Sequence, residues 1–222
     1  MIYVMSDIHG DLKKYRSVMS KINLQAEDNL YILGDVIDRY PNGIEILFEL
    51  MRMSNTTVLL GNHELMMSEV IKDEFQWNKV RKWYINGGMA THNAFRDLSR
   101  DRKEAISGFI EQMPLTAEVQ VNGINYLLVH GIPPDLKDAI PNSAESEKEF
   151  ATWMRITPED IMPSGKIVIF GHTPTEYYQE GTPLRIWHGG DKIGIDCGCG
   201  NECPVCRLAC LRLDDMAEFY SE

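Results

Sequence analysis

The chain has 222 residues, 44% of them hydrophobic and 25% charged, and its 33 acidic residues against 22 lysines and arginines give a formal net charge of −11. This composition is typical of a globular protein with one core of ordinary size, and its acidic balance argues against nucleic-acid binding and against docking on anionic membranes. No apolar run reaches the length of a membrane span and the N-terminal segment lacks the features of a signal peptide, so we expect a cytoplasmic chain.

The first third of the chain predicts alternating strands and helices. Strands are expected at residues 2–5, 30–33 and 56–60, and helices at 12–22 and 44–51, from apolar runs and from apolar residues at helical spacing. Asp11 directly precedes the first helix, where a short carboxylate can accept hydrogen bonds from free amides. This alternating order indicates a parallel sheet with right-handed crossovers.

A helical insertion and a second group of strands follow. Residues 63–113 have a helical pattern that is broken once, at Asn86-Gly87-Gly88, and Asn122-Gly123 lies between two apolar runs as a hairpin signal. Further strands are expected at residues 115–121, 124–129, 166–170, 192–195 and 207–213, and a helix at 145–154. The sequence therefore predicts one α/β domain over residues 1–222, with a helical insertion at about 63–113 and a cysteine-rich loop at 197–206.

Five apolar runs end in polar clusters, most of them beside glycine. The clusters are Asp7-Ile8-His9-Gly10, Gly34-Asp35-Val36-Ile37-Asp38-Arg39, Gly61-Asn62-His63-Glu64, His130-Gly131 and Gly171-His172-Thr173. A single aspartate or histidine after a strand is often only a turn former. Ligands of open α/β sheets, however, bind beyond the carboxyl ends of the strands, so five such clusters in strand order favour one shared site.

This series of clusters resembles the calcineurin-like metallophosphoesterases. The Asp38-Arg39 pair and the Gly-Asn-His-Glu form resemble their phosphoprotein phosphatase branch, and above all the bacterial and phage serine/threonine phosphatases of the phage lambda type. Residues 83–88, 153–155 and 170–174 are similar to that subgroup as well. The resemblance covers nearly the whole chain and implies a central β-sandwich flanked by helices.

The resemblance implies a centre of two divalent metal ions. One ion would take Asp7, His9 and Asp35, and the other would take Asp35, Asn62, His130 and His172, so that Asp35 bridges the two. A set of oxygen and imidazole ligands suits Mn²⁺, Zn²⁺ or Fe, of which manganese is our expectation. Two such ions lower the pKa of a bridging water, and the resulting hydroxide would attack phosphorus in line without a covalent phosphoenzyme.

The resemblance also implies roles for four residues around the metal ions. Arg39 and Arg155 would clamp the phosphate, because a planar guanidinium matches two phosphate oxygens. His63 would protonate the leaving alkoxide as general acid, and Asp38 would hydrogen-bond His63 and favour its protonated form. The remaining polar residues of interest stay outside the ligand set: Glu64 as a supporting residue, and His92 and His188 as structural or exposed.

The expected activity is hydrolysis of phosphoserine or phosphothreonine in a phosphoprotein or phosphopeptide. A symmetrical bis(5'-nucleosyl)-tetraphosphatase shares the same metal motifs and is the alternative, although the Gly-Asn-His-Glu form and the length of the chain fit the phosphatases better. A third interpretation is a regulatory module that keeps the fold without catalysis. It predicts missing ligands, and none of the expected ligands is missing.

All five cysteines lie between residues 197 and 210. In a cytosolic chain we expect them to stay reduced. Cys197, Cys199, Cys203 and Cys206 could then hold a structural zinc ion, or they could simply line a hairpin loop. Cys210 lies in an apolar run and is expected to be a core residue.

Overall fold

The chain folds into two five-stranded sheets. This computed structural model describes residues 1–72, 75–181 and 184–222, and in that part of the chain each sheet mixes parallel and antiparallel strands. The first sheet contains, in spatial order, β10 (Ala217–Tyr220), β9 (Ala209–Arg212), β1 (Ile2–Met5), β2 (Asn29–Ile32) and β3 (Thr56–Val58). The second contains β4 (Thr116–Val121), β5 (Ile124–Val129), β6 (Ile167–Phe170), β8 (Lys192–Gly194) and β7 (Trp187–His188).

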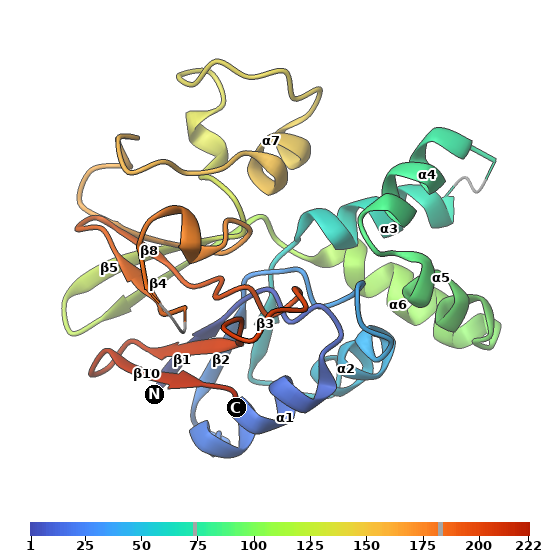
Figure 1. Cartoon of the computed structure of the whole chain (residues 1–222), viewed down its shortest axis with the longest axis horizontal. Coiled ribbons are helices and arrows are strands. Elements are labelled where there is room, and N and C mark those ends of the chain that lie inside the picture. Colours follow the sequence, from blue (N-terminus) through green and yellow to red (C-terminus); the bar gives the residue numbers. More distant parts are fainter. Residues whose placement is uncertain (73–74, 182–183) are drawn as a thin grey trace.

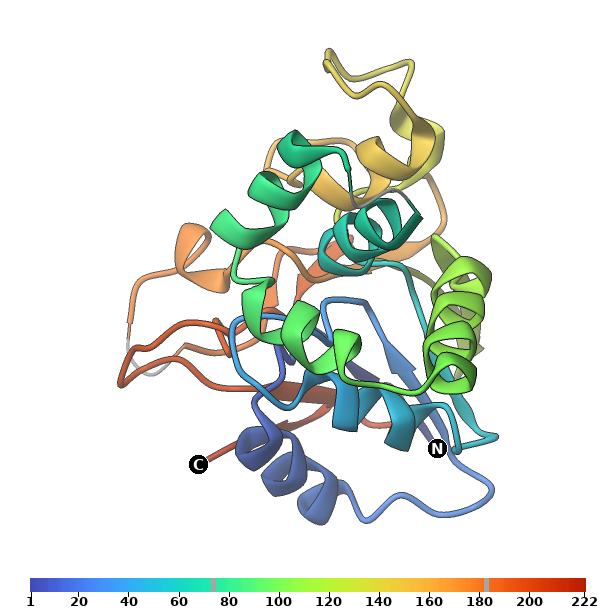
Figure 2. The same ribbon diagram turned by 90° about the vertical axis from the view of Figure 1, so that its right-hand side faces the viewer.

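Helices flank the two sheets (Figures 1 and 2). They are α1 (Leu12–Ile22), α2 (Gly43–Leu50), α3 (Asn62–Lys72), α4 (Trp77–Ile85), α5 (Met89–Arg96), α6 (Arg100–Gln112) and α7 (Glu147–Trp153), with 3-10 turns η1 (Pro134–Leu136) and η2 (Thr175–Tyr177). Helices α3 to α6 gather at one end of the sandwich, while α1 and α7 lie on opposite sides of it (Figure 1). The expected β-sandwich with flanking helices is confirmed, and α3 to α6 occupy residues 62–112, where the sequence has a helical pattern.

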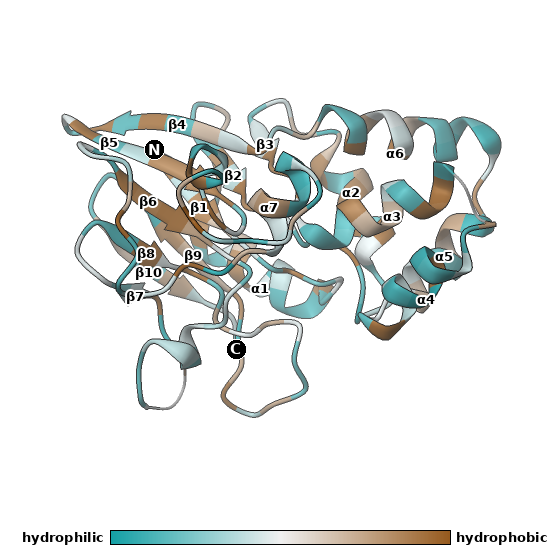
Figure 3. Cartoon of the chain, turned by 90° about the horizontal axis from the view of Figure 1, so that it is seen from above, coloured by the Kyte–Doolittle hydropathy of each residue, from teal (hydrophilic) through white to brown (hydrophobic). Residues whose placement is uncertain are grey.

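The strand residues alternate between two cores, as the period of two along a strand requires. On β1, Val4 packs between the sheets, whereas Tyr3 and Met5 pack under the helices. On β6, Ile169 faces the space between the sheets, and Phe170 belongs to a third cluster. Figure 3 shows how strongly hydrophobic these two strands are. Burial of both faces therefore holds the two sheets and their helices together.

Parallel pairing brings the chemistry to one edge. In the first sheet, β1, β2 and β3 run parallel, and in the second sheet β5, β6 and β8 run parallel. Each of these six strands is followed within a few residues by one of the polar side chains described below. Because parallel strands share one carboxyl edge, the fold itself collects the polar clusters.

The boundaries differ from the sequence predictions in a few places. The structure adds two strands that the sequence did not predict, β7 and β10, and starts the final predicted strand at Ala209 rather than at residue 207. Both added strands are edge strands and are only partly buried, so they lack the long apolar run that marks a central strand. Asp11 caps α1 as expected, since its side chain accepts from the Lys14 amide at 3.0 Å.

The cysteine prediction is wrong for one pair. Cys203 and Cys206 form a disulfide, whereas Cys197, Cys199 and Cys210 are buried free thiols. The two-residue spacing forms a turn, with the Cys206 amide bonded to the Cys203 carbonyl at 3.2 Å, which brings the two sulfurs together. Two of the four sulfurs assigned to a zinc site are thus bonded to each other, so the site is not formed. Burial also raises the pKa of Cys197 to about 12, which disfavours the thiolate that zinc requires.

The other cysteine prediction holds, because Cys210 is fully buried in β9. Within the described ranges, none of the helices is both long enough and apolar enough to cross a bilayer. The assignment of residues 1–222 to one domain stays a prediction.

Candidate active site

The structure brings the predicted site residues together around one small hollow of ≈ 220 Å³. Seven of them line it, namely Asp7, Asp35, Arg39, Asn62, His63, Arg155 and His172. The other three, His9, Asp38 and His130, lie directly behind this lining and contact it through hydrogen bonds or close ion-pair distances. Residues from both sheets and from the helical insertion therefore meet at the shared carboxyl edge.

The loops that carry these residues have an unusual backbone. Six site residues that are not glycine adopt left-handed conformations: Asp7 (φ 53°), His9 (φ 51°), Asp35 (φ 54°), Asp38 (φ 72°), Arg39 (φ 65°) and His172 (φ 59°). This region is disfavoured for side chains with a Cβ, although aspartate tolerates it better than most. Strained backbone of this kind clusters where a function holds it in place. The strain marks the same residues that the motifs mark.

Asp35 lies at the centre of the cluster. Its carboxylate is 3.7 Å from His9 Nε2, 3.8 Å from His63 Nε2 and 3.4 Å from His130 Nε2, and it accepts the His63 backbone amide at 3.0 Å. Two groups of potential ligands share it: one with His9 and His63, the other with His130 and His172. This is the arrangement that a bridging ligand between two ions requires.

The donor set fits divalent cations. His9 Nδ1 lies 3.1 Å from the Ile37 carbonyl and His130 Nδ1 lies 2.6 Å from the Leu33 carbonyl, so each Nδ1 donates to a carbonyl and each Nε2 faces the cluster. His130 Nε2 is then 3.0 Å from Asn62 Oδ1 and 3.4 Å from Asp35 Oδ1. These three potential ligand atoms therefore lie close enough together to share one cation.

The electrostatics point the same way. Burial lowers the pKa of His9 well below its usual value and lowers the pKa of His172 to about 3, so both rings are neutral, as metal ligands must be. Burial opposes ionisation of Asp35, yet the surrounding histidines hold its pKa below the ordinary value. Burial also raises the pKa of Asp7. Bound cations would offset this cost of burying Asp7 as a carboxylate.

Asp7, which follows β1 in the first sheet, also contacts the loop that follows β6 in the second sheet. One of its oxygens accepts from the Ser6 hydroxyl and from the His172 backbone amide, the latter at 3.0 Å. Its other oxygen lies 3.9 Å from His9 Nε2. His172 Nε2 in turn lies 3.1 Å from the Trp153 carbonyl, which leaves Nδ1 as its acceptor nitrogen.

His63 and Asp38 form the expected pair. His63 Nδ1 lies 2.7 Å from Asp38 Oδ2, and the same oxygen accepts from Trp83 Nε1 at 2.7 Å. The Asp38 amide donates to Thr91 Oγ1 at 3.0 Å. Burial alone would lower the pKa of His63, but the charges of Asp35 and Asp38 outweigh it and raise the pKa. Trp83 and Thr91, which fix Asp38, come from the helical insertion and were not predicted from the sequence.

Two arginines border the hollow on its solvent side. Arg39 is exposed, and its Nη1 donates to Asn201 Oδ1 at 3.2 Å, while its backbone amide bonds to the Gly87 carbonyl at 3.1 Å. Gly87 has φ +97°, and a Cβ there would meet the Arg39 side chain at 3.0 Å. Arg155 is also exposed, with its guanidinium 5.4 Å from the Tyr177 ring centre. Both positively charged groups can therefore reach an anion in the hollow.

Glu64 has a larger role than the sequence suggested. It is fully buried and accepts four backbone amides: those of Asp35 (2.8 Å), Val36 (2.8 Å), Ile37 (3.3 Å) and Gly61 (3.2 Å). Burial and the neighbouring Asp35 raise its pKa to about 7. The Gly-Asn-His-Glu motif could have indicated this, because its glutamate stands one helical turn from a glycine whose amide needs an acceptor. Glu64 thus binds the loop after β2 to the start of α3.

A Glu64→Gln substitution is expected to destabilise the protein by about 1–3 kcal/mol, because the new amide NH₂ faces buried N–H donors and leaves them without acceptors. Urea unfolding of the metal-free protein measures this change. Glu69→Gln, on the same helix but only partly buried, is the matched control and should stay within about 0.5 kcal/mol of the parent chain. Equal stability of the two variants would contradict the role of Glu64.

Asp196 is a further site residue that the sequence analysis did not predict. It follows β8, lines the hollow, and is 5% exposed. One oxygen accepts from the Gly198 amide at 2.8 Å, and burial raises its pKa well above the ordinary value, with a further contribution from Asp7. A pattern did exist, because Asp196 follows a strand and has a glycine two residues further on, and each of the other clusters also contains a glycine.

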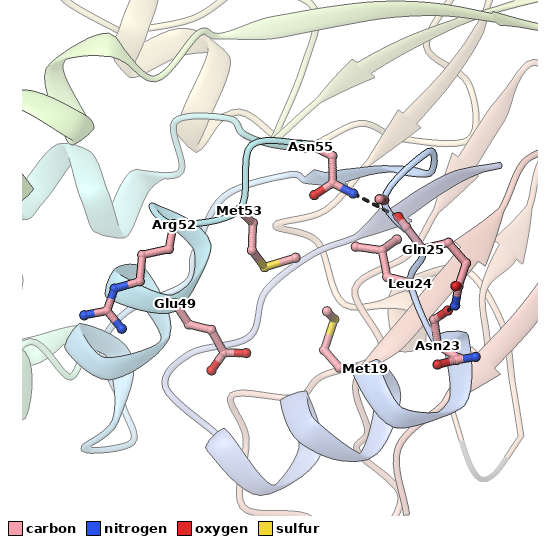
Figure 4. Close-up of a pocket in the computed structure, with 9 residues that line it drawn as sticks. Met19, Asn23, Leu24, Gln25, Glu49, Arg52, Met53 and Asn55 are labelled. Carbon is pink, nitrogen blue, oxygen red and sulfur yellow. Dashed lines mark hydrogen bonds between the residues drawn. The ribbon is translucent and has the colours of Figure 1, made fainter.

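A larger hollow lies elsewhere and has different chemistry. It is ≈ 570 Å³ in volume, lies between α1 and α2, and is lined in part by Met19, Leu24 and Met53, with Glu49 and Arg52 at its side (Figure 4). Asn55 closes one end through a hydrogen bond from Nδ2 to the Gln25 carbonyl at 3.1 Å. It shares no lining residue with the Asp35 cluster, so chemistry rather than size identifies the candidate site.

Comparison with known proteins identifies the family to which this chain belongs. The sequence pattern of the family described as calcineurin-like phosphoesterase matches residues 1–195. A symmetrical bis(5'-nucleosyl)-tetraphosphatase of Paracidovorax citrulli is 22% identical over 199 residues, which cover 84% of this chain. The chain spans only 62% of the length of that relative.

Solved structures share the fold. The crystal structure of a candidate diadenosine tetraphosphatase superimposes with a TM-score of 0.66 at 17% identity, covering 99% of this chain and 91% of the other. A protein serine/threonine phosphatase from Saccharomyces cerevisiae gives a TM-score of 0.57 at 14% identity, covering 87% and 65%. The family implies divalent metal ions, which the two His/Asp groups of the cluster could hold. The chain therefore belongs to the calcineurin-like phosphoesterase family.

Proposed function

We propose that the Asp35 cluster binds two divalent metal ions and hydrolyses phosphate monoesters. Asp7, His9 and Asp35 would hold one ion, and Asp35, Asn62, His130 and His172 would hold the other. The observation that carries this proposal is the gathering of these side chains around Asp35, next to the His63–Asp38 pair and below two arginines. Manganese remains our expectation for the metal, on the ligand types alone.

The chain's own residues would divide the remaining work. Bound ions supply positive charge and an activated water, which is the chemistry that two-metal sites offer. Arg39 and Arg155 would hold the phosphate oxygens and neutralise charge in the transition state. Asp38 occupies His63 Nδ1, so the proton to be given to the leaving oxygen is held on Nε2, which points toward Asp35. The raised pKa of His63 keeps that proton available near neutral pH.

Within this chemistry, we propose phosphoserine and phosphothreonine side chains as substrates. The hollow of ≈ 220 Å³ is smaller than the sites that enclose drug-sized ligands, which are about 300–1,000 Å³, and it suits a phosphoryl group on a short side chain. A peptide backbone could then lie across the open rim, where Arg39, Arg155 and Tyr177 are exposed.

A dinucleoside tetraphosphate is the second candidate substrate. The names of the Paracidovorax citrulli relative and of the candidate diadenosine tetraphosphatase favour it. The rim also offers two aromatic rings, Trp153 and Tyr177, on which a base could stack. Phosphoprotein and nucleotide substrates therefore need a direct comparison.

The deciding experiment measures kcat/KM of the Mn²⁺-loaded protein on a phosphoserine peptide, a phosphothreonine peptide and diadenosine tetraphosphate under one condition. We expect the better phosphopeptide to exceed the nucleotide by at least about tenfold, which corresponds to about 1.4 kcal/mol in transition-state binding. A preference of that size for the nucleotide would replace the first substrate class by the second. No turnover of any phosphate ester with any divalent metal would refute the hydrolase assignment of this site.

A further inference from the structure

The loop from Gly198 to Cys206, here named the cysteine loop, lies directly against the candidate site. A Cβ on Gly200 would lie 2.3 Å from His9 Cδ2 and 2.6 Å from Arg39 Nη1, so the loop backbone touches both side chains. Only glycine allows this approach. His9 and Arg39 are both far from Gly200 in the sequence, so this contact depends on the shape of the cysteine loop.

Asn201, the next residue in the cysteine loop, holds the Arg39 guanidinium. Its Oδ1 accepts from Arg39 Nη1 at 3.2 Å, and among the described residues this is the one side-chain hydrogen bond of that guanidinium. Both residues line the hollow. A long exposed arginine loses much rotamer freedom when it binds an anion, and a partner that already fixes it reduces that loss.

The position of Asn201 depends in turn on the disulfide. The Asn201 amide bonds to the Gly198 carbonyl at 2.9 Å, and the Cys203 amide bonds to the Asn201 carbonyl at 3.0 Å. The Cys203–Cys206 disulfide closes the loop immediately after these bonds. Cys206 Sγ packs under Gly198, 2.9 Å from where a Cβ would lie, and Gly198 itself has φ +77°. Asn201 is thus fixed between a glycine turn and a disulfide.

We propose that Asn201 is a positioning residue for Arg39, and that the Cys203–Cys206 disulfide makes phosphate binding at this site sensitive to reduction. The proposal rests on the proposed function, in which Arg39 binds the phosphate. Opening the disulfide frees the end of the loop and releases Asn201 from Arg39. Because Arg39 contacts the phosphate in the ground state and in the transition state alike, the change falls mainly on KM.

The reductive step is chemically complete with a phosphine as reductant. Cys203 is partly exposed, whereas Cys206 is buried, so the phosphine attacks the Cys203 sulfur. The S–S bond breaks and Cys206 leaves as a thiolate. Water supplies the oxygen of the phosphine oxide and the two protons that yield two thiols, so phosphorus loses the two electrons that the sulfurs gain.

The test compares four proteins: the parent chain, Asn201→Ala, the double variant Cys203→Ser/Cys206→Ser, and Glu202→Gln as an exposed control in the same loop. Each is loaded with Mn²⁺ and assayed on an aryl phosphate with and without phosphine. Asn201→Ala should raise KM by about 3- to 10-fold, as expected for the loss of a hydrogen bond to an exposed charged group, with kcat within about twofold. Glu202→Gln should match the parent chain.

Phosphine should raise the KM of the parent chain by a similar factor and leave the double variant unchanged, and reoxidation should restore the parent value. Alkylation of the unfolded protein should modify three thiols before reduction and five after it. Five before reduction, an unchanged KM in Asn201→Ala, or an equal phosphine effect on the double variant would each overturn the proposal. The last result would indicate loss of metal instead.

A binding measurement separates this proposal from the proposed function. Titration of the Mn²⁺-loaded proteins with inorganic phosphate should give weaker binding for Asn201→Ala and for the phosphine-treated parent chain, whether or not esters are hydrolysed. Unchanged phosphate binding overturns the positioning role even in an active enzyme. Absent turnover with the expected change in phosphate binding overturns the proposed hydrolysis and supports the role of Asn201.

Discussion

His63→Asn is expected to lower kcat on a phosphoserine peptide by about 10²–10⁴-fold, the range that general acid catalysis supplies. Asparagine can still donate a hydrogen bond from its amide NH₂ group to the Asp38 carboxylate, but it has no acidic proton to give to the serine alkoxide. His63 is buried and its Nδ1 lies 2.7 Å from Asp38. In the described part of the chain it is therefore the imidazole that Asp38 holds in place. The measurement is steady-state hydrolysis of the peptide by Mn²⁺-loaded protein.

The leaving group provides the control for this prediction. A nitrophenolate is a much weaker base than a serine alkoxide and departs without protonation, so His63→Asn should slow a nitrophenyl phosphate far less than the phosphopeptide. His188→Asn removes an exposed imidazole that pairs with Glu218 at 2.8 Å, and it should leave both rates unchanged. An equal loss on both substrates would show that His63 supports the site in some other way, for example by holding Asp35.

Much of the site was predictable because its residues follow strands. Asp7, Asp35 and His130 each come just after an apolar run, and the parallel pairing of those runs places them at one edge. Two independent signals, strand order and polar type, therefore identify the same residues. The Asp38–His63 hydrogen bond was predicted as well, and the structure has it at 2.7 Å.

The residues that escaped prediction act through contacts that no local pattern encodes. Trp83 and Thr91 reach Asp38 from helices about fifty residues away in the chain. Asp196 comes from the sixth of the parallel strands, beyond the last cluster that the sequence singled out. Which distant helix packs on a loop depends on tertiary packing, and helical periodicity identifies only that a face is buried.

The cysteines show a different limit of sequence reasoning. The spacing of the cysteines is compatible with four thiolates around zinc and with a disulfide. Reduced thiols follow only from the expectation of a cytoplasmic chain. In the fold, Cys197 and Cys199 are buried against the two cores, and only Cys203 and Cys206 share one turn. The local turn, which spacing alone does not encode, separates the bonded pair from the two free thiols.

Asp35→Asn is expected to abolish metal binding at one or both positions and to lower kcat/KM by about 10³-fold or more, since metal ions contribute several kcal/mol to charge stabilisation. Asp35 is the residue common to both groups of potential ligands, and the substitution removes its negative charge and one of its two ligand oxygens. The fold should persist, because asparagine keeps an oxygen that can accept the His63 amide. Metal content of the dialysed protein, measured together with turnover, checks the prediction.

Removal of metal ions from the parent chain with a chelator tests the same role without a substitution. Removal of metal should abolish turnover, and added Mn²⁺ should restore it in the parent chain and in Asp101→Asn, an exposed acid-to-amide change in α6, but not in Asp35→Asn. Full activity of Asp35→Asn with two bound ions would contradict its place as the bridging ligand. A protein of net charge −11 can bind phosphate only where cations outnumber carboxylates, and Asp35 is the residue on which that local reversal of charge depends.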